Sequence, residues 1–460
     1  MQKTNSHWIQ DWNPEDETFW QKTGRRVARR NLIWSILAEN IGFSVWLIWS
    51  VVAARLNKAG FHYTTEQLFS LVALPGLTGS LMRFPYTFAV PRFGGRNWTI
   101  VSALLLFIPT TGLTMLVRRP DTPYWLMALV AATAGLGGGN FASSMANISF
   151  FYPDRAKGFA LGLNAAGGNI GVSTVQLLIP IVMTVPLLAG TPGRVLHLEN
   201  AGLFWMPLIA LAAFGAARFM NNLASARSTF RDQIGVTRRK HTWVMSWLYI
   251  GTFGSFIGYS AAFPLLLKTQ FPQLTMNLAF LGALVGSIAR PLGGKLADRI
   301  GGTRVTLWNF VFMGMATLGV IVFLHQHSFG GFLTMFLILF VTTGVGNGST
   351  FRMIPVIFRR EHLQSVAGQG AAAEARALET ARRESAAVLG FTSAVGACGG
   401  YLIPRSFGAS IHATGGVELA LQAFLGFYVT CVALTWWFYA RKTAPVARAV
   451  GNLAEPQLGI

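Results

Sequence analysis

Two arginines lie inside stretches of the chain that are otherwise apolar. Arg83 occurs in "GSLMRFPYTF" and Arg290 in "SIARPLGG". The guanidinium group keeps its positive charge, and its flat fork of N–H donors matches a planar oxyanion better than the ammonium group of lysine does. Two such residues therefore indicate anion binding, provided that the elements that carry them place both in one polar cavity.

The composition shows which kind of element carries these arginines. The chain has 460 residues, of which 52% are hydrophobic and only 12% are charged, and its mean hydropathy is +0.46. Soluble domains hold about one-quarter charged residues, so this composition indicates an all-α integral membrane protein. Apolar runs of about 20 residues, long enough to cross a ~30 Å hydrocarbon layer, recur along the chain. We predict twelve transmembrane helices, at 31–54, 66–89, 98–117, 124–150, 158–188, 201–219, 242–267, 275–296, 303–325, 329–357, 385–411 and 416–440.

The positive charge is distributed unevenly between the connections. The net charge is +20, and of the 37 Lys and Arg residues 24 fall in the two tails and alternate loops, 6 in the opposite loops and 7 inside the predicted helices or at their ends. Positive loops face the cytoplasm, so both termini are expected there, in a bacterial inner membrane. No basic face is left for a nucleic acid.

An internal repeat relates the two halves of the chain. Residues 83–96, "RFPYTFAVPRFGGR", match residues 290–303, "RPLGGKLADRIGGT", at an offset of 207, and the same offset relates two later glycine-rich stretches. The matched pairs are Arg83 with Arg290, Arg92 with Arg299, Gly137 with Gly344, Gly139 with Gly346 and Asn140 with Asn347. A repeat with an even number of helices gives two bundles of the same orientation, as in six-plus-six transporters. The predicted parts are a cytoplasmic tail (1–30), a six-helix bundle (31–219), a cytoplasmic linker (220–241), a second six-helix bundle (242–440) and a cytoplasmic tail (441–460).

Carboxylates are scarce inside the predicted helices. Of 17 Asp and Glu residues only Glu39, in "ILAENIGFSVW", lies well within one. A buried charge costs at least ~2.5–3.5 kcal/mol in a bilayer, so Arg83 and Arg290 should face a cavity and have a partner. One carboxylate cannot neutralise both, and a mobile anion would supply the rest. The alternative is a purely structural network of ion pairs.

A loop motif suggests how the two halves switch. "GKLADRIGGTR" (294–304) resembles the cytoplasmic loop signature of the major facilitator superfamily, and "PRFGGRNW" (91–98) is a weaker copy. Asp298, Arg299 and Arg92 are the expected gating residues, because such charges can hold one of two packings. The alternative is an ordinary solvated basic loop.

The glycine-rich stretches point to one family. "GLGGGNFASSMANISFFYP" (135–153) and "GVGNGSTFRMIPVIF" (344–358) resemble the two nitrate signatures of the nitrate/nitrite porter family, the NarK-type transporters of that superfamily. The resemblance runs over nearly the whole chain and implies two six-helix bundles with one central site that opens alternately to each side. It also implies a set of substrate-binding residues, namely Arg83, Arg290, the ring-stacking Phe141 and Phe253, and the polar Tyr249 and Asn169. Asn140 and Asn347 are added because close packing of glycine-rich helices brings them within reach of a small solute.

Two residues depart from familiar members of the family. Arg352 replaces a neutral amide, and Glu39 replaces an apolar residue, so both are candidates for coupling or for supporting the site. Glu39 either carries a proton, because burial raises the pKa of a carboxyl group, or neutralises an extra arginine. The expected activity is exchange of nitrate for nitrite. The alternatives are nitrate–proton symport through Glu39, or an anion receptor or channel.

Other classes of function receive little support. No "GxxxxGK[ST]" motif is present, and "HQH" (325–327) has no acidic or cysteine residue beside it, so neither an enzyme, a cofactor nor a metal site is expected. A monomer in the lipid bilayer, with nitrate, nitrite and in one alternative protons as its ligands, is the expected state. The segment 364–386 is Ala- and charge-rich, with Glu379 and Arg383 at i,i+4 spacing, and predicts a cytoplasmic surface helix.

Overall fold

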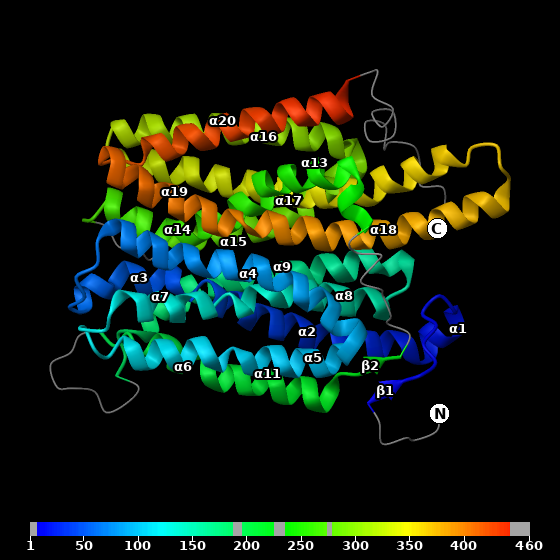
Figure 1. Cartoon of the computed structure of the whole chain (residues 1–460), viewed down its shortest axis with the longest axis horizontal. Helices are drawn as coiled ribbons and strands as arrows, with labels where there is room; N and C mark the ends of the chain where they lie inside the picture. The colour runs from blue at the N-terminus through cyan, green and yellow to red at the C-terminus, as the bar shows by residue number, and fades with distance from the viewer. Residues whose placement is uncertain (1–6, 187–195, 225–234, 274–277, 442–460) are drawn as a thin grey trace. The chain divides into compact units, whose positions relative to one another are not determined.

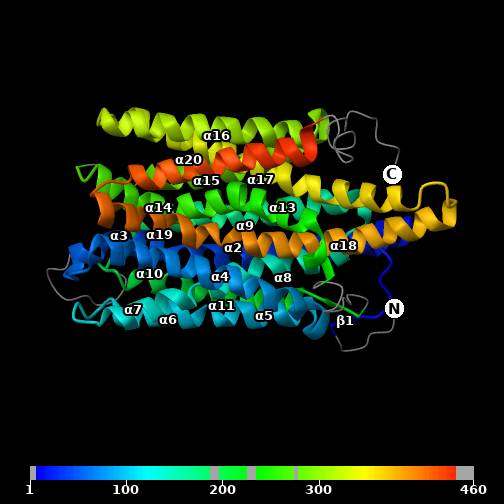
Figure 2. The same cartoon turned by 45° about the horizontal axis from the view of Figure 1, so that its top comes forward.

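The structure is a computed structural model that describes residues 7–186, 196–224, 235–273 and 278–441. The described residues are almost entirely helical, and they cluster into two compact units (Figures 1 and 2). The first unit holds the described residues of 1–228, 263–268 and 275–280, and the second holds those of 229–262, 269–274 and 281–460. The bundle limits expected from the sequence stay predictions. Residues 225–234 of the expected linker and all of the second tail but residue 441 lie outside the described residues.

The first unit contains the short strands β1 (Trp8–Ile9) and β2 (Asn222–Leu223) and a series of helices. These are α1 (Glu17–Phe19), the π-helix η1 (Trp20–Gly24), α2 (Arg25–Trp46), α3 (Ile48–Leu56), the short 3-10 helix η2 (Asn57–Ala59), α4 (Thr65–Phe93), α5 (Gly95–Leu105), α6 (Phe107–Leu116), α7 (Tyr124–Thr133), α8 (Leu136–Phe151), α9 (Asp154–Val182), α10 (Asn200–Leu203) and α11 (Trp205–Phe219). Helix α2 packs against α8 and α9, and α4 packs against α8.

The second unit is built in the same way. Its helices are the 3-10 turn η3 (Val236–Arg238), α13 (Lys240–Tyr249), the π-helix η4 (Ile250–Gly254), α14 (Ser255–Gln270), α15 (Ala279–Ile300), α16 (Gly302–His325), α17 (Phe329–Ser365), α18 (Ala371–Ala397), α19 (Gly399–Thr414), α20 (Glu418–Thr435) and the π-helix η6 (Trp436–Ala440). Helix α14 is divided, since its residues up to 262 cluster with this unit and 263–268 with the first. Helices α16 and α17 pack along each other, and α17 packs against α18.

Eleven helical stretches of the described chain are long and apolar enough to cross a membrane. The remaining one of the twelve predicted helices corresponds to α15, which has 22 residues but is not among these eleven, because charged residues such as Arg290 and Lys295 lower its hydropathy. Large apolar side chains face outward in both units, for example Phe159, which is 77% exposed. Polar side chains such as Arg83, which is 0% exposed, lie inside. This inverted distribution fits a lipid surround and confirms the predicted multi-pass membrane fold.

The helix limits differ from the sequence prediction at several places, among them the helix expected at 385–411. The helix expected at 385–411 is instead two helices that meet at Cys398, and the first of them begins at Ala371. The predicted surface helix around 364–386 is therefore the extension of a membrane helix, and it carries the expected ion pair between Arg383 and Glu379. Figures 1 and 2 show this extension of α18 running out beside the end of α17.

The segment before α2 is folded onto the end of the first unit where α4 gives way to α5. Strand β1 pairs in parallel with β2, which follows α11. The indole of Trp12 donates a hydrogen bond to the Phe150 carbonyl at 3.1 Å and packs edge-on against Phe151. Part of the expected 1–30 tail thus forms a small cap that links the start of α2, the end of α8 and the exit from α11.

Candidate functional site

Arg83 is held inside the first unit by the residues of two other helices. It comes from α4, and its Nε donates a hydrogen bond to the Gly138 carbonyl of α8 at 3.1 Å. Its guanidinium carbon lies 4.7 Å from the ring centre of Phe141 and 5.4 Å from that of Trp46. Both distances are within the ≈ 6 Å at which a cation is attracted to a ring face. The predicted partners Arg83 and Phe141 are therefore in contact, and Trp46 joins them without having been predicted.

The three consecutive glycines of α8 each make room for a different neighbour. A Cβ on Gly137 would lie 2.1 Å from the Gly42 carbonyl oxygen of α2, and one on Gly139 would lie 2.8 Å from the ring of Tyr86. A Cβ on Gly138 would lie 2.7 Å from the indole of Trp46. Real Cβ contacts are longer than 3 Å, so any side chain here would force helices apart. The glycine signature thus sets the helix spacing around Arg83.

Two predicted amides lie buried in the same unit. Asn140 of α8 is 4% exposed and Asn169 of α9 is 1% exposed. Among the described residues, neither the oxygen nor the nitrogen of either amide has a hydrogen-bond partner. A buried polar group without a partner is costly, roughly 1–3 kcal/mol each, unless a solute or water completes it. Both amides are thus available to a polar ligand.

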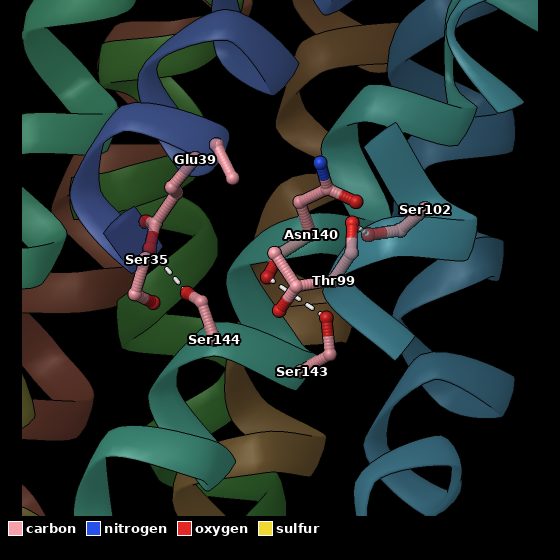
Figure 3. Close-up of a pocket in the computed structure, with 8 residues that line it drawn as sticks. Ser35, Glu39, Thr99, Ser102, Asn140, Ser143 and Ser144 are labelled. Atoms are coloured by element: carbon pink, nitrogen blue, oxygen red, sulfur yellow. Dashed lines mark hydrogen bonds between the residues drawn. The ribbon is translucent and has the colours of Figure 1, made fainter. Parts of the chain in front are cut away.

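Glu39 lies at the edge of a small polar pocket in the first unit (Figure 3). The pocket is lined by Ser35, Ala38, Glu39, Thr99, Ser102, Asn140, Ser143 and Ser144, and it has room for about one water molecule. Asn164 donates to the Glu39 Oε2 at 2.6 Å, and the Ser144 hydroxyl donates to the same oxygen. The carboxyl group, 1% exposed, is thus held by neutral donors of α8 and α9.

The second unit presents Arg290 in a comparable setting. Arg290 of α15 is 6% exposed, and its guanidinium carbon lies 5.7 Å from the ring centre of Phe351 of α17. The Tyr249 hydroxyl donates to Asn347 Oδ1 at 2.7 Å, and the Tyr249 ring stacks on Phe253 at 5.4 Å between centres. The four predicted substrate-binding residues of this unit are all buried, and Phe351 joins them without having been predicted.

The second glycine stretch again lets helix backbones approach. A Cβ on Gly344 would lie 2.2 Å from the Gly286 carbonyl oxygen, and one on Gly348 would lie 2.1 Å from the Arg290 carbonyl oxygen. A Cβ on Gly346 would lie 2.4 Å from the Asn309 amide. Helix α17 therefore packs directly on the turn of α15 that carries the arginine, as α8 does on α4.

Comparisons with known proteins place the chain in a family. The model of the Major Facilitator Superfamily matches residues 40–375. The chain is 46% identical to the nitrate/nitrite transporter NarU of Escherichia coli, over 96% of this chain and 98% of that protein. The chain belongs to the major facilitator superfamily, in its NarK-type nitrate/nitrite porter family.

Two further comparisons extend this assignment. The chain is 36% identical to a protein of Thermus thermophilus named "Probable nitrate/nitrite antiporter NarK2", over 96% of this chain and 99% of that protein. The crystal structure of a bacterial homologue of the human lysosomal transporter Spinster, inward-facing and occupied, has a TM-score of 0.63 at 14% identity. The match covers 88% of this chain and 95% of the Spinster homologue, and it supports the assignment of the fold alone.

An ion pair joins the superfamily loop signature of the second unit to helix α17. Asp298, at the end of α15, accepts a hydrogen bond from Arg352 Nε of α17 at 2.5 Å, and both side chains are about half exposed. Arg352, a candidate for coupling or for supporting the site, thus has an acidic partner in Asp298, and its role stays a prediction. Arg299 and Arg92 are exposed, and the Arg92 guanidinium lies against the ring of Phe93.

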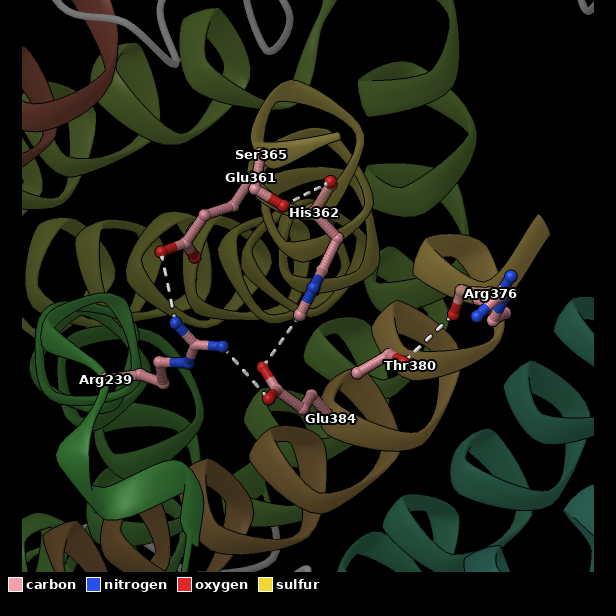
Figure 4. Close-up of polar contacts among 7 residues, drawn as sticks. All are labelled: Arg239, Glu361, His362, Ser365, Arg376, Thr380 and Glu384. Atoms are coloured by element: carbon pink, nitrogen blue, oxygen red, sulfur yellow. Dashed lines mark hydrogen bonds and ion pairs between the residues drawn. The ribbon is translucent and has the colours of Figure 1, made fainter. Parts of the chain in front are cut away.

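A second charged cluster, which the sequence analysis did not identify, ties α17 to α18 (Figure 4). Glu384 of α18 accepts from Arg239 at 3.1 Å and contacts the His362 ring nitrogen at 3.0 Å, and Arg239 also reaches Glu361 at 3.7 Å. Burial by itself would raise the pKa of Glu384, but the hydrogen bonds and charges of His362 and Arg239 hold its pKa below the ordinary value. Arg239 immediately precedes α13, so the cluster fixes the entry into the second unit.

Proposed function

We propose that the chain is a secondary active transporter for nitrate and nitrite that exchanges the two anions by alternating access. The relatives' names support the substrates and, for the Thermus protein, the antiport. The single observation that carries the proposal is the setting of Arg83, a fully buried guanidinium placed against two aromatic ring faces. A weakly hydrated planar anion suits such a site, because it loses less water than phosphate or sulfate on entering it.

The roles of the individual residues follow from their chemistry. Arg83 and Arg290 bind the anion through their paired N–H donors, and Phe141 and Phe253 offer ring faces to its flat surface. Tyr249, Asn347, Asn140 and Asn169 supply the remaining donors. An anion that neutralises the arginines lowers the cost of changing conformation, so an empty carrier switches slowly and exchange is favoured.

Counterflow in proteoliposomes tests this proposal. Vesicles loaded with nitrite should take up labelled nitrate much faster than empty vesicles, because the return step needs an anion. Arg83→Lys and Arg290→Lys keep the charge and lose the planar fork, so each should reduce uptake strongly. Uptake that is equally fast without internal anion would support a channel, and unchanged uptake in both lysine variants would contradict recognition by the fork.

The buried Glu39 favours a second mode, nitrate–proton symport. Its carboxyl group is enclosed by Asn164 and Ser144 next to a pocket large enough for water, which would give a proton a place to bind and a route to it. Symport predicts nitrate uptake into vesicles without internal anion when the outside is acidic, and loss of that uptake in Glu39→Gln. Exchange predicts that Glu39→Gln keeps counterflow.

The placement in the cell is part of the same proposal. The transporter would act as a monomer in the lipid bilayer of a bacterial inner membrane. The ends of α4 and α15, with their loop signatures, would face the cytoplasm together with both termini, because the positive loops lie on that side. Protease accessibility in right-side-out and inverted vesicles checks this orientation.

A further inference from the structure

We propose that Trp46 is a positioning residue for Arg83 and thereby sets the affinity for the anion. The inference rests on the proposed function, since the anion is taken to bind Arg83. Trp46 is the last residue of α2 and is 1% exposed. Its indole ring centre lies 5.4 Å from the guanidinium carbon of Arg83, and this contact joins α2 to the arginine of α4.

The indole itself is fixed by contacts with two other helices, α4 and α8. Its N–H donates to the Pro75 carbonyl of α4 at 2.7 Å. A Cβ on Gly79 would lie 2.5 Å from the indole nitrogen, so only glycine at this position of α4 lets the ring reach that carbonyl. On the side of α8, a Cβ on Gly138 would lie 2.7 Å from the ring. One hydrogen bond and close contacts with two helices thus orient the ring whose face lies toward Arg83.

Gly138 connects the ring with the arginine directly. Its carbonyl accepts the hydrogen bond from Arg83 Nε, and its missing side chain leaves the space that the indole fills. Trp46, Gly138 and Phe141 thus hold the guanidinium through two ring faces and one carbonyl. Ordering a flexible side chain before binding removes an entropy cost that the ligand would otherwise have to meet. The arginine is preorganised by this arrangement.

The internal repeat gives independent support. The offset of 207 that relates Arg83 to Arg290 relates Trp46 to Phe253, since 253 − 46 = 207. Phe253 is also a fully buried aromatic residue of its unit. An aromatic side chain therefore occupies the matching position in both halves, although only Phe253 belongs to the expected binding set.

Transport kinetics separate positioning from packing. Trp46→Leu should raise the nitrate concentration for half-maximal counterflow by about two- to thirty-fold, the range expected for losing one cation–π contact, with less change in the maximal rate. Trp46→Phe keeps a ring face and should recover most of the affinity. Gly138→Ala leaves Arg83 and Trp46 chemically intact but displaces the indole and the α4 backbone at Gly79, so it should weaken affinity in the same direction. Trp205→Leu, which removes another fully buried tryptophan of the first unit, should leave the half-maximal concentration unchanged.

A chemical measurement follows Arg83 without any transport. Phenylglyoxal modifies guanidinium groups, and peptide mass spectrometry reports the rate at Arg83. The rate should rise in Trp46→Leu and Gly138→Ala and stay at the wild-type value in Trp205→Leu. If wild-type protein neither binds nor exchanges nitrate, the proposed function fails, and the modification rates alone decide the role of Trp46.

The outcomes are distinct. Wild-type affinity and wild-type modification of Arg83 in folded Trp46→Leu would overturn the inference, as would a Trp46→Phe variant as defective as Trp46→Leu. If Trp46→Leu does not fold, Trp46→Phe and Gly138→Ala carry the test. Near-normal nitrate affinity in Trp46→Phe together with weak affinity in Gly138→Ala supports the positioning role of Trp46. Normal affinity in both variants overturns that role.

Discussion

Asn222 caps helix α5 from a distant part of the chain, and its removal should destabilise the first unit. Its side-chain oxygen accepts from the backbone N–H groups of Arg96 at 2.9 Å and Asn97 at 3.3 Å. These are the second and third residues of α5, the two donors that an N-cap side chain normally satisfies. The residue at the cap position itself is Gly94, with φ of 84°, so it has no side chain to do this.

The magnitude follows from the cost of losing a cap. Replacing an N-cap acceptor with alanine costs about 0.5–2 kcal/mol, and Asn222 is 1% exposed, so water does not readily replace it. A loss of 1 kcal/mol lowers the melting temperature of a 150–250-residue domain by about 2–4 °C. Asn222→Ala should therefore lower the unfolding midpoint of the first unit by about 1–8 °C.

Thermal unfolding in detergent, followed by tryptophan fluorescence, measures this shift. Asn222→Asp keeps the accepting oxygen and should unfold close to the wild-type temperature. Asn57→Ala is the matched control, since Asn57 makes hydrogen bonds to Tyr63 at an exposed position and should cost less than about 0.5 kcal/mol. A wild-type midpoint for Asn222→Ala, or an equal loss in Asn222→Asp, would refute the capping role.

Three further predictions concern other contacts of the structure. Glu384→Gln should make the melting temperature depend less on pH in the acid range. The depressed pKa of Glu384 stabilises the folded wild type above the ordinary value of 4.5, and this contribution, about 1 kcal/mol or less, is lost as the pH falls below 4.5. Melting curves recorded as a function of pH measure the difference. Gly137→Ala should impair folding far more than a surface change, because its Cβ would meet the Gly42 carbonyl at 2.1 Å, and the yield of monodisperse protein in size-exclusion chromatography measures this. Asp298→Asn should cost less than about 1 kcal/mol of stability, as is usual for exposed ion pairs, yet change the maximal counterflow rate if the pair acts in gating.

The sequence was informative where the signal was local or duplicated. Apolar runs and the offset of 207 predicted the membrane helices and the two buried arginines, because lipid imposes long apolar segments and the repeat marks equivalent places. The position of Asn222 could not be predicted in this way. It lies 126 residues from Arg96, and nothing near "PRFGGRNW" indicates which side chain completes the first turn of α5. The same holds for Trp46, whose contact with Arg83 depends on three helices and two glycines.

Arg352 shows what the depth of a residue in a predicted helix cannot indicate, namely its partner on another helix. The apolar pattern ends near 357, which made Arg352 look like an intramembrane charge, but α17 continues to Ser365 and Arg352 reaches Asp298 at the end of α15. The repeat contains the missing signal. At the offset of 207, Asp298 corresponds to Pro91 and Arg352 to Met145, since 298 − 207 = 91 and 352 − 207 = 145. The acid and the base are therefore both present in the second half and both absent from the first.

The loop signatures of the two halves are therefore stabilised by different contacts. In the first unit a Cβ on Gly94 would lie 2.3 Å from the Asn222 oxygen, and one on Gly95 would lie 1.8 Å from the Asn147 oxygen, so neutral amides occupy the space beside the turn. Asn222 belongs to β2, which the folded segment before α2 holds in place. An ion pair responds to salt and to a single charge change, whereas a buried amide cap does not. High salt should therefore loosen the loop of α15 and leave that of α4 intact, which hydrogen exchange at the two loops would reveal.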